Sequence, residues 1–497
     1  MLNYGKLASD WDEFSHWADI VKVMTTLNDF GSNPNSNSMF ASYPPAMALF
    51  QYLLQKINLL LQPGAAFSEW RLYFSYQILF LSLLFPFFSS LRFKRPVQAL
   101  LVAITVCISP LLFSPDVFTM LYIDPFLGIV SGASLAMIFA WPKKDWFYRT
   151  YIFFSASILV LSKESGMLFA LFITAAFLID EWFFRHAGAN NPQATRRLRT
   201  PILLSVFAVL SVLLPKLLWA LVLRRDGITP SISSGVTLEG LMEAVIHQNP
   251  PYRLQVVYEF FGAFFTQGVS LGETGIRLFF PVLSVTMPAL LYLLYRAHHG
   301  DECENGFRRL FFWLMIGMLA FYTAGLCLIY MFHFSEFEAL RLASFQRYLM
   351  VVFQSLWMLC VLSAVLLLQK KPDSMRRIVA FLVCIVFLAT PWKAAATFMG
   401  RLSVSESVAT REPYDQLSRD VMDLVGDQPA KIYSSRRRQT VGTILSCAIR
   451  YGQISVNSGG RALANRSMKM TSGRRPWSRN DGWISFAPTM SMSCCIR

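Results

Sequence analysis

Residues 348–368 read YLMVVFQSLWMLCVLSAVLLL, a run without an acidic or basic side chain. A helix needs about 20 mainly apolar residues to cross the hydrocarbon core of a bilayer, and this run is long enough. Nine more apolar runs lie near 73–90, 97–115, 118–140, 147–162, 165–181, 201–222, 277–295, 309–332 and 377–392. We therefore expect an all-α polytopic membrane protein with about ten transmembrane helices and outer-face loops that carry short helices.

Two of these runs leave the number of spans open. The runs 147–162 and 165–181 are short and meet at Ser162-Lys163-Glu164-Ser165-Gly166, so one kinked element is an alternative to two spans. Composition supports the membrane class, since only 15% of the 497 residues are charged and 54% are hydrophobic, whereas soluble proteins carry about 25% charged residues. The eight cysteines show no metal-ligand spacing and are expected to be small apolar residues.

Basic residues are unequally distributed between two sets of loops that alternate along the chain. One set carries seventeen, namely Arg92, Lys94, Arg95, Lys143, Lys144, Arg149, Arg185, Arg196, Arg197, Arg199, Arg296, Arg308, Arg309, Lys370, Lys371, Arg376 and Arg377. The other set carries seven, namely Lys163, Arg224, Arg225, Arg253, Arg277, Arg341 and Arg347. Because Lys and Arg accumulate in cytoplasmic loops, residues 1–72, 223–276, 333–347 and 393–497 are predicted to lie outside the cytoplasm.

This topology divides the chain into an outer segment 1–72, a transmembrane domain 73–392, an outer α/β segment 393–433 and a tail 434–497. Residues 1–72 lie outside without a preceding span, so we expect that one or more N-terminal helices are missing from this chain. The tail carries eleven basic residues and one acid and has neither helical nor strand periodicity. One interpretation is a basic arm that contacts anionic lipid headgroups or an acidic polymer. We favour a shift of the reading frame near Ser434.

Ionisable residues lie at or inside several predicted span boundaries on the outer face. Asp124 lies just inside the third run, and Lys163 and Glu164 separate the fourth from the fifth. A charge at membrane depth costs about 2.5–3.5 kcal/mol on insertion scales, and such residues usually face a cavity with a partner. They predict a cavity that opens outward at the lipid–water boundary. The alternatives are a helix N-terminal carboxylate for Asp124 and a local ion pair at a helix junction for Lys163 and Glu164.

The polar segment ahead of the first run contains the acidic pair Asp12-Glu13, within the string WDEFSHW at residues 11–17. Two carboxylates beside aromatic rings and a histidine suit acid–base chemistry at a membrane surface, although a solvated acidic turn has a similar composition. His16 follows Asp12 by four residues and is expected to be a hydrogen-bonding orienter or a rim residue. No second histidine stands at ligand spacing from His16, so no metal site or cofactor is predicted, and metal dependence is left open.

Four strings of the sequence carry a resemblance to a known family. They are Asp12-Glu13-Phe14-Ser15-His16-Trp17, Tyr43-Pro44-Pro45, Leu161-Ser162-Lys163-Glu164-Ser165-Gly166 and Ser344-Phe345-Gln346-Arg347-Tyr348. With the predicted topology, they resemble a bacterial branch of the GT-C superfamily of integral-membrane glycosyltransferases. This superfamily includes protein O-mannosyltransferases and the aminoarabinose and Rgt-type transferases. The resemblance covers roughly residues 10–430, and the acidic pair in the first outer loop is its signature. The chain departs from the family because it lacks the helix that precedes this pair.

The resemblance implies an enzyme that moves a sugar from a polyprenyl-phosphate carrier to an acceptor hydroxyl on the extracytoplasmic side, usually with inversion. Asp12 would accept the proton of the acceptor, with Glu13 as the second choice. Asp124 would hold the acceptor or a sugar hydroxyl, and Lys163 and Arg347 would bind the lipid phosphate. The full expected site is Asp12, Glu13, His16, Asp124, Lys163, Glu164, Arg341 and Arg347.

Two other function classes are compatible with the sequence. A polysaccharide polymerase or ligase relies, as a family, on Arg and His of a late outer loop, and the loop 223–276 offers Arg224, Arg225, Arg253 and His247. A lipid or solute transporter should have broken helices, internal symmetry and charges at mid-membrane; Lys216 alone lies near mid-span. For the transferase, the expected partners in the cell membrane are a polyprenyl-phosphate-linked sugar, a lipid, glycan or protein acceptor, and membrane lipids, without nucleic acid.

Overall fold

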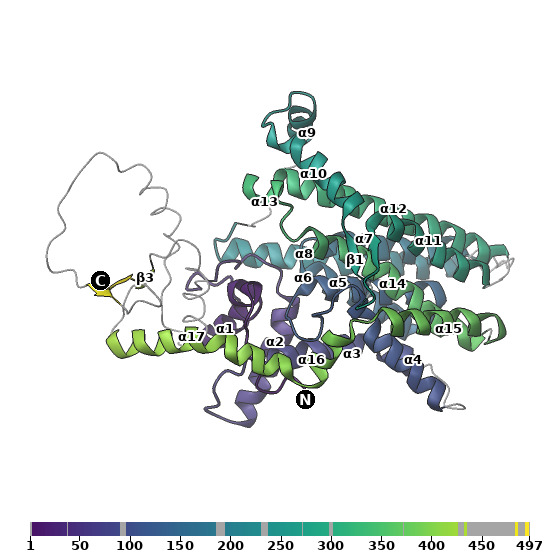
Figure 1. Ribbon diagram of the computed structural model, residues 1–497. Coiled ribbons are helices and arrows are strands. Elements are labelled where there is room, and N and C mark those ends of the chain that lie inside the picture. The colour runs from purple at the N-terminus through teal and green to yellow at the C-terminus, as the bar shows by residue number, and fades with distance from the viewer. Residues whose placement is uncertain are drawn as a thin grey trace.

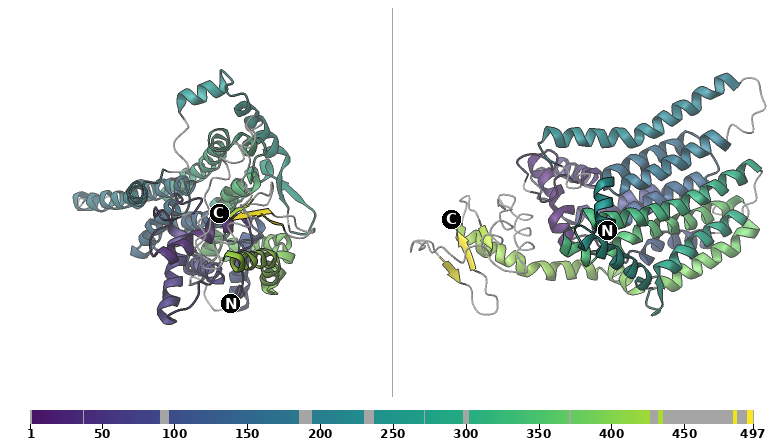
Figure 2. Two further views of the ribbon diagram at one scale, coloured as in Figure 1. Left: turned by 90° about the vertical axis from the view of Figure 1, so that its left-hand side faces the viewer. Right: turned by 90° about the horizontal axis from the view of Figure 1, so that it is seen from above.

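The computed structural model describes residues 2–36, 38–89, 96–184, 194–229, 237–270, 272–297, 302–370, 372–425, 432–434, 483–485 and 493–496. Within these ranges nearly all regular structure is helical, and the long helices run side by side as one bundle (Figures 1 and 2). The helices are η1 (Glu13–Trp17), α1 (Asp19–Leu27), α2 (Ala46–Leu61), α3 (Trp70–Ser89), α4 (Pro96–Ile108), η2 (Ser109–Leu112), α5 (Ile123–Ala140), α6 (Trp146–Ser162), α7 (Gly166–Ile179), η3 (Asp180–Phe184), α8 (Ala194–Arg225), α9 (Leu238–Val245), α10 (Tyr252–Thr266), α11 (Phe280–Ala297), α12 (Glu302–Phe332), α13 (Glu336–Leu340), α14 (Phe345–Lys370), α15 (Pro372–Ala389), α16 (Trp392–Met399) and α17 (Leu402–Val425).

A helix stands at each of the ten predicted apolar runs, but not all of them are long enough to cross a membrane. Among the described residues, six helices are long and apolar enough, namely Trp70–Phe88, Ile123–Ala140, Pro201–Arg225, Phe280–Ala297, Asn305–Phe332 and Phe345–Leu368. A seventh results if Met375–Ala389 and Trp392–Met399, which meet at 76°, are counted as one broken span. Helices α6 and α7 are shorter, with 17 and 14 residues. The chain is an all-α protein with several potential spans; ten spans are not confirmed.

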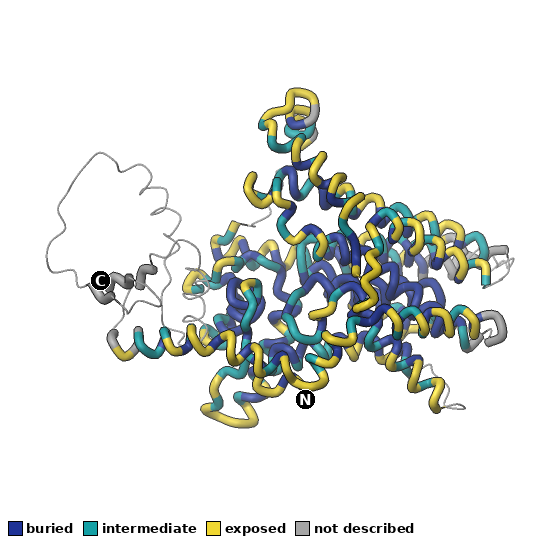
Figure 3. The backbone as a smooth tube through the Cα atoms, in the orientation of Figure 1, coloured by how far each residue is buried: buried dark blue, intermediate teal, exposed yellow. Residues whose placement is uncertain are grey.

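The centre of the bundle is the helix pair α5 and α14. Every residue of α5 is buried, and α14 is buried over almost all of its apolar length (Figure 3). Gly128 and Gly132 face α14, and a Cβ on Gly132 would lie 2.4 Å from the carbonyl oxygen of Ser355. Small residues four positions apart allow two helix backbones to approach closely. This close approach brings the N-terminal ends of α5 and α14 together, where Asp124 and Arg347 are located.

Replacing Gly132 with alanine is expected to destabilise the bundle by about 1–3 kcal/mol, because the added methyl group overpacks a close backbone contact. The matched control is Gly317→Ala in α12, where a Cβ meets nothing within 4 Å. This control should be neutral or slightly stabilising, since alanine has the higher helix propensity. Thermal unfolding of both variants in the same detergent measures the difference, and equal melting temperatures would contradict the close packing of α5 on α14.

Helices α8, α11 and α12 form an apolar periphery around this centre. Only 22%, 28% and 33% of their most apolar windows are buried, in that order. On α8 the exposed side chains include Leu203, Leu210 and Leu217. Backbone groups in hydrocarbon must be satisfied within the segment, and a helix does this while presenting apolar side chains to lipid. These three helices therefore have the surface that contact with lipid acyl chains requires.

The N-terminal segment is bound along α17, about 400 residues later in the sequence. Arg401 donates to the carbonyl oxygen of Tyr4 at 2.6 Å, and Lys6 donates to that of Ser403 at 3.2 Å. Further along α17, the buried guanidinium of Arg411 donates to the carbonyl oxygen of Ala8 at 2.9 Å and to Glu69 at 3.0 Å. Glu69 immediately precedes α3 and also accepts a hydrogen bond from the Ala8 N–H at 2.7 Å. These contacts hold the residues just ahead of the acidic pair against the bundle.

Short strands complete the described structure. Strands β1 (Gly268–Ser270) and β2 (Arg277–Phe279) form an antiparallel pair ahead of α11. Strand β3 (Ile432–Ser434) lies at the end of the predicted α/β segment 393–433, and it pairs with β5 (Ser493–Ile496) in a sheet of order β3-β5-β4, with β4 at Trp483–Ser485. The rest of the predicted basic tail, 435–482, 486–492 and 497, lies outside the described residues.

Candidate functional site

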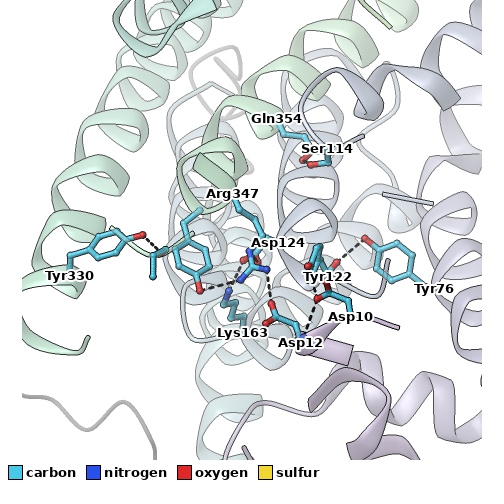
Figure 4. Close-up of polar contacts among 12 residues, drawn as sticks. Asp10, Asp12, Tyr76, Ser114, Tyr122, Asp124, Lys163, Tyr330, Arg347 and Gln354 are labelled. Carbon is cyan, nitrogen blue, oxygen red and sulfur yellow. Dashed lines mark hydrogen bonds and ion pairs between the residues drawn. The ribbon is translucent and has the colours of Figure 1, made fainter. Parts of the chain in front are cut away.

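Four charged side chains meet at one end of the α5–α14 pair (Figure 4). Arg347 donates from Nη1 to Asp12 at 2.6 Å, and its Nε lies 3.4 Å from Oδ2 of Asp124. The other oxygen of Asp124 is 2.5 Å from Nζ of Lys163. We call Asp12, Asp124, Lys163 and Arg347 the charged cluster. The arrangement alternates acid and base, so that Arg347 bridges two carboxylates and Asp124 bridges two cations.

Helix ends place all four residues of the charged cluster. Asp12 immediately precedes η1, Asp124 lies in the first turn of α5, and Arg347 lies in the first turn of α14. Lys163 follows α6 in an extended conformation, with φ −162° and ψ 155°. The N-terminus of a helix carries a partial positive charge, which favours a carboxylate such as that of Asp124. Both sequence interpretations of Asp124 therefore describe the same position: it is in the first helical turn and it belongs to the cluster.

Aromatic rings surround the two cations. The guanidinium of Arg347 lies 4.5 Å from the ring centroid of Tyr122 and 5.2 Å from that of Tyr348, and Nζ of Lys163 lies 4.5 Å from the Tyr348 ring. Cations over aromatic faces gain electrostatic attraction that grows as water is excluded. Asp10 accepts hydrogen bonds from the Tyr122 hydroxyl at 2.7 Å and from the backbone N–H of Asp12 at 3.1 Å. Tyr122 and Asp10 therefore connect the position of Asp12 to that of Arg347.

The electrostatics of the cluster favour a protonated Lys163. Burial acts to lower the pKa of the Lys163 amine, but the Asp124 carboxylate and the neighbouring Tyr348 raise it above its usual value. Its side chain retains 22% exposure, and those of Asp12 and Arg347 retain 27% and 26%. Two cations and one carboxylate are thus partly accessible at one spot, whereas the Asp124 side chain, at 6% exposure, is buried. An incoming anion could exchange with a carboxylate as the partner of either cation, because charge-assisted bonds to phosphate and carboxylate are similar in geometry.

The structure places Glu13, the second member of the acidic pair, away from the charged cluster. Its side chain is fully buried and accepts four hydrogen bonds: from the backbone N–H groups of Ser9, Asp10 and Leu121 and from the Tyr73 hydroxyl. Burial raises the pKa of Glu13, and the hydrogen bonds from Ser9, Tyr73 and Asp10, together with the charge of Lys6, oppose the rise. A carboxylate that accepts four internal bonds has little capacity left for a substrate, so this geometry assigns Glu13 to holding the N-terminal segment in place.

His16 lies among aromatic rings, not at the rim of the site. Its imidazole packs edge-on against Trp17 and Tyr43, with ring centroids 4.5 Å and 4.7 Å apart, and Phe40 adds a third such contact. The side chain is buried, and burial lowers its pKa to about 3, helped by the nearby positive charge of Lys163. His16 is therefore neutral at physiological pH and extends the wall of rings beside the cluster.

Acid should destabilise the protein through His16. The unfolded chain takes up a proton near the ordinary histidine pKa of 6.5, whereas the folded state stays neutral down to a pKa of about 3. Stability is therefore expected to fall by up to about 1.4 kcal/mol for each pH unit below this ordinary value. The variant His16→Gln lacks this contribution. The free energy of unfolding of both proteins, measured at about pH 7 and about pH 5, tests this expectation. If the unmodified protein and His16→Gln lose the same stability between these two pH values, the contribution of His16 is contradicted. Asp19, whose pKa is raised to about 6, acts in the opposite direction but is common to both proteins.

Two further predicted site residues lie outside the cluster. Glu164 forms an ion pair with Lys216 of α8, although its neighbour Lys163 faces Asp124. Arg341 stacks on the ring of Phe337 at 4.1 Å. In the loop proposed for a polymerase or ligase, Arg225 pairs with Asp226 and with Asp29, and Arg253 stacks on Phe332. Glu164 and Arg341 therefore do not belong to the charged cluster.

Sequence reasoning missed three residues that shape the site. Asp10 stands two residues before Asp12, and Tyr122 two residues before Asp124, so proximity to the acids was a usable signal for both. Arg411 had no such signal, because its role depends on a contact between α17 and a segment 403 residues away. Among the described residues, no group of three or more His, Cys, Asp or Glu side chains is arranged to hold a metal ion.

Comparisons with known protein families, with characterised proteins and with solved structures give no match to this chain.

Proposed function

We propose that this protein is a membrane glycosyltransferase that moves a sugar from a polyprenyl-phosphate carrier to an acceptor hydroxyl. The observation that carries the proposal is the charged cluster, in which Arg347 joins the candidate base Asp12 to the Asp124–Lys163 pair. A lipid-phosphate donor presents an anion next to a hydrocarbon chain. Cations at the end of a bundle with several potential membrane spans suit such a molecule.

The reaction assigns one task to each residue of the cluster. The acceptor oxygen attacks the anomeric carbon and forms the new glycosidic bond, while the bond from that carbon to the phosphate oxygen breaks. The electron pair of the broken bond leaves with the lipid phosphate, whose charge Lys163 and Arg347 stabilise. The proton of the acceptor passes to the Asp12 carboxylate. Asp124 stays bound to Lys163 and orients it.

The ion pair between Arg347 and Asp12 also suggests how Asp12 becomes a base. In the structure one oxygen of the Asp12 carboxylate accepts a hydrogen bond from Nη1 of Arg347. A donor phosphate bound to Arg347 would replace Asp12 as its partner, and Asp12 would then be free to accept the proton. Donor binding would thus precede activation of the acceptor. In this proposal the charged cluster faces the extracytoplasmic side of the cell membrane, and the excess of basic residues in the other set of loops supports this orientation.

The variant Arg347→Lys tests the part played by Arg347. Lysine keeps the charge but cannot donate to two partners in fixed directions. Sugar transfer from a polyprenyl-phosphate sugar in proteoliposomes is expected to fall roughly 10²-fold, the size found when one donor to a developing negative charge is removed. The control is Arg341→Lys, which changes an arginine outside the cluster and should leave transfer unchanged. Equal activities of the two variants would contradict phosphate binding by Arg347.

A transporter of an anionic solute or lipid is the second candidate, because one observation favours it. Lys216 of α8 and Glu164 form an ion pair beside the break between α6 and α7, and broken helices with paired charges are typical of transporters. Uptake of the intact polyprenyl-phosphate sugar without release of the sugar, in the same proteoliposomes, would favour transport over transfer.

A further inference from the structure

Helix α2 (Ala46–Leu61) has its polar and apolar faces reversed relative to a helix that faces water. Gln51, Gln55 and Asn58 recur at helical spacing and are almost completely buried, at 2%, 1% and 4% exposure. The opposite face consists of leucine and isoleucine, and its side chains are exposed. They are Leu49, Leu53, Ile57, Leu60 and Leu61, of which Leu60 and Leu61 are 80% and 77% exposed.

The buried polar residues have partners at the start of the first potential span. Gln55 donates to the carbonyl oxygen of Ser68 at 2.7 Å, and Gln51 donates to that of Leu72 at 3.2 Å. Leu72 is the third residue of the potential span Trp70–Phe88. Gln51 and Gln55 thus donate to carbonyl oxygens at the start of this potential span. The middle of α2 therefore lies at the depth where a membrane crossing by α3 would begin. Helix α2 is packed beside α3 and α1 (Figure 1).

We propose that the exposed face of α2 docks on the lipid bilayer, at the boundary between headgroups and acyl chains. A helix of 16 residues is too short to span but long enough to lie in this boundary. The exposed face of α2 is apolar, and the one basic residue of the helix, Lys56, is partly buried. An apolar stripe of this kind fits the acyl side of the boundary, and its depth is set by the hydrogen bonds to α3.

This docking would also set the height of the charged cluster above the membrane. Helix α2 begins three residues after Tyr43, whose ring packs against His16. His16 in turn lies in η1, four residues after Asp12, which immediately precedes this helix. A bilayer-bound α2 would therefore hold Asp12 and Lys163 at a constant distance from the lipid surface. The docking itself does not depend on which reaction the site performs.

Photocrosslinking in lipid nanodiscs tests the proposal on the full chain. A benzophenone amino acid is placed at Leu53 or at Leu60, both exposed in the structure, and at Glu412 of α17 as an exposed polar control. After irradiation, mass spectrometry identifies what each position has bound. Covalent lipid adducts are expected at both leucine positions and should be absent at position 412.

Two results would overturn the proposal. A crosslink from position 53 or 60 to a second copy of the chain would show that α2 is a protein interface. An absence of lipid adduct at both positions, in protein that elutes as the unmodified protein does, would show that the face is not at the bilayer. Neither readout involves sugar transfer, so failure of this proposal and failure of the glycosyltransferase proposal are distinguishable.

Discussion

Replacing Asp12 with asparagine is expected to reduce sugar transfer by about 10²- to 10⁴-fold, which is the usual contribution of a general base. The amide keeps the size of the side chain and can still contact Arg347, but it cannot take the proton of the acceptor. Turnover of a polyprenyl-phosphate sugar in proteoliposomes measures the effect. Donor binding should persist, because Lys163 and Arg347 are intact and Arg347 no longer has an anionic partner in Asp12.

The matched control for this experiment is Asp29→Asn. Asp29 is a more exposed carboxylate that also faces an arginine, with 3.8 Å between its Oδ1 and Nη2 of Arg225. It therefore reports what the loss of an ion-paired carboxylate does by itself, and its activity should match that of the unmodified protein. Full transfer by the Asp12 variant would refute its role as the base. Absence of transfer by the unmodified protein would instead favour the transporter.

Replacing Arg411 with alanine is expected to cost about 3–5 kcal/mol of stability, because it leaves one buried and one partly buried carboxylate without their cation. Arg411 is only 1% exposed, and its guanidinium binds Glu69 at 3.0 Å and Asp415 at 3.3 Å as well as the backbone of Ala8. The change also removes one of the contacts that hold the segment ahead of Asp12 against α17. Thermal unfolding in nanodiscs should show a lower melting temperature, accompanied by faster proteolysis near Ala8.

The control for Arg411 lies two turns further along the same helix. Arg419 pairs with Glu412 at 2.8 Å, but both side chains are exposed, at 38% and 62%. Exposed pairs contribute about 0–1 kcal/mol, so Arg419→Ala should have almost no effect on the melting temperature. If Arg411→Ala and Arg419→Ala have the same melting temperature, the buried network around Arg411 does not stabilise the fold as described.

The helical nature of the chain could be predicted from local sequence because apolar runs and helix length are local properties. Each of the ten apolar runs coincides with a helix in the structure. The number of spans was harder to predict, since a helix such as α7 is strongly apolar but, with 14 residues, is shorter than a membrane span requires. Which helices form the centre was also not predictable from hydropathy. Helices α5 and α8 are both apolar, yet one is fully buried and the other largely exposed.

Residue type and position along the chain were sufficient to nominate Asp12, Asp124, Lys163 and Arg347, because charged groups at the ends of apolar runs are costly unless partnered. They could not separate these four from Glu13, Glu164 and Arg341, whose chemistry and placement in the sequence are alike. Only the tertiary structure decided this, since ion pairs depend on distances of about 3–4 Å between side chains that lie up to 335 residues apart. The close packing of α5 on α14, and the binding of the N-terminal segment to α17, set those distances.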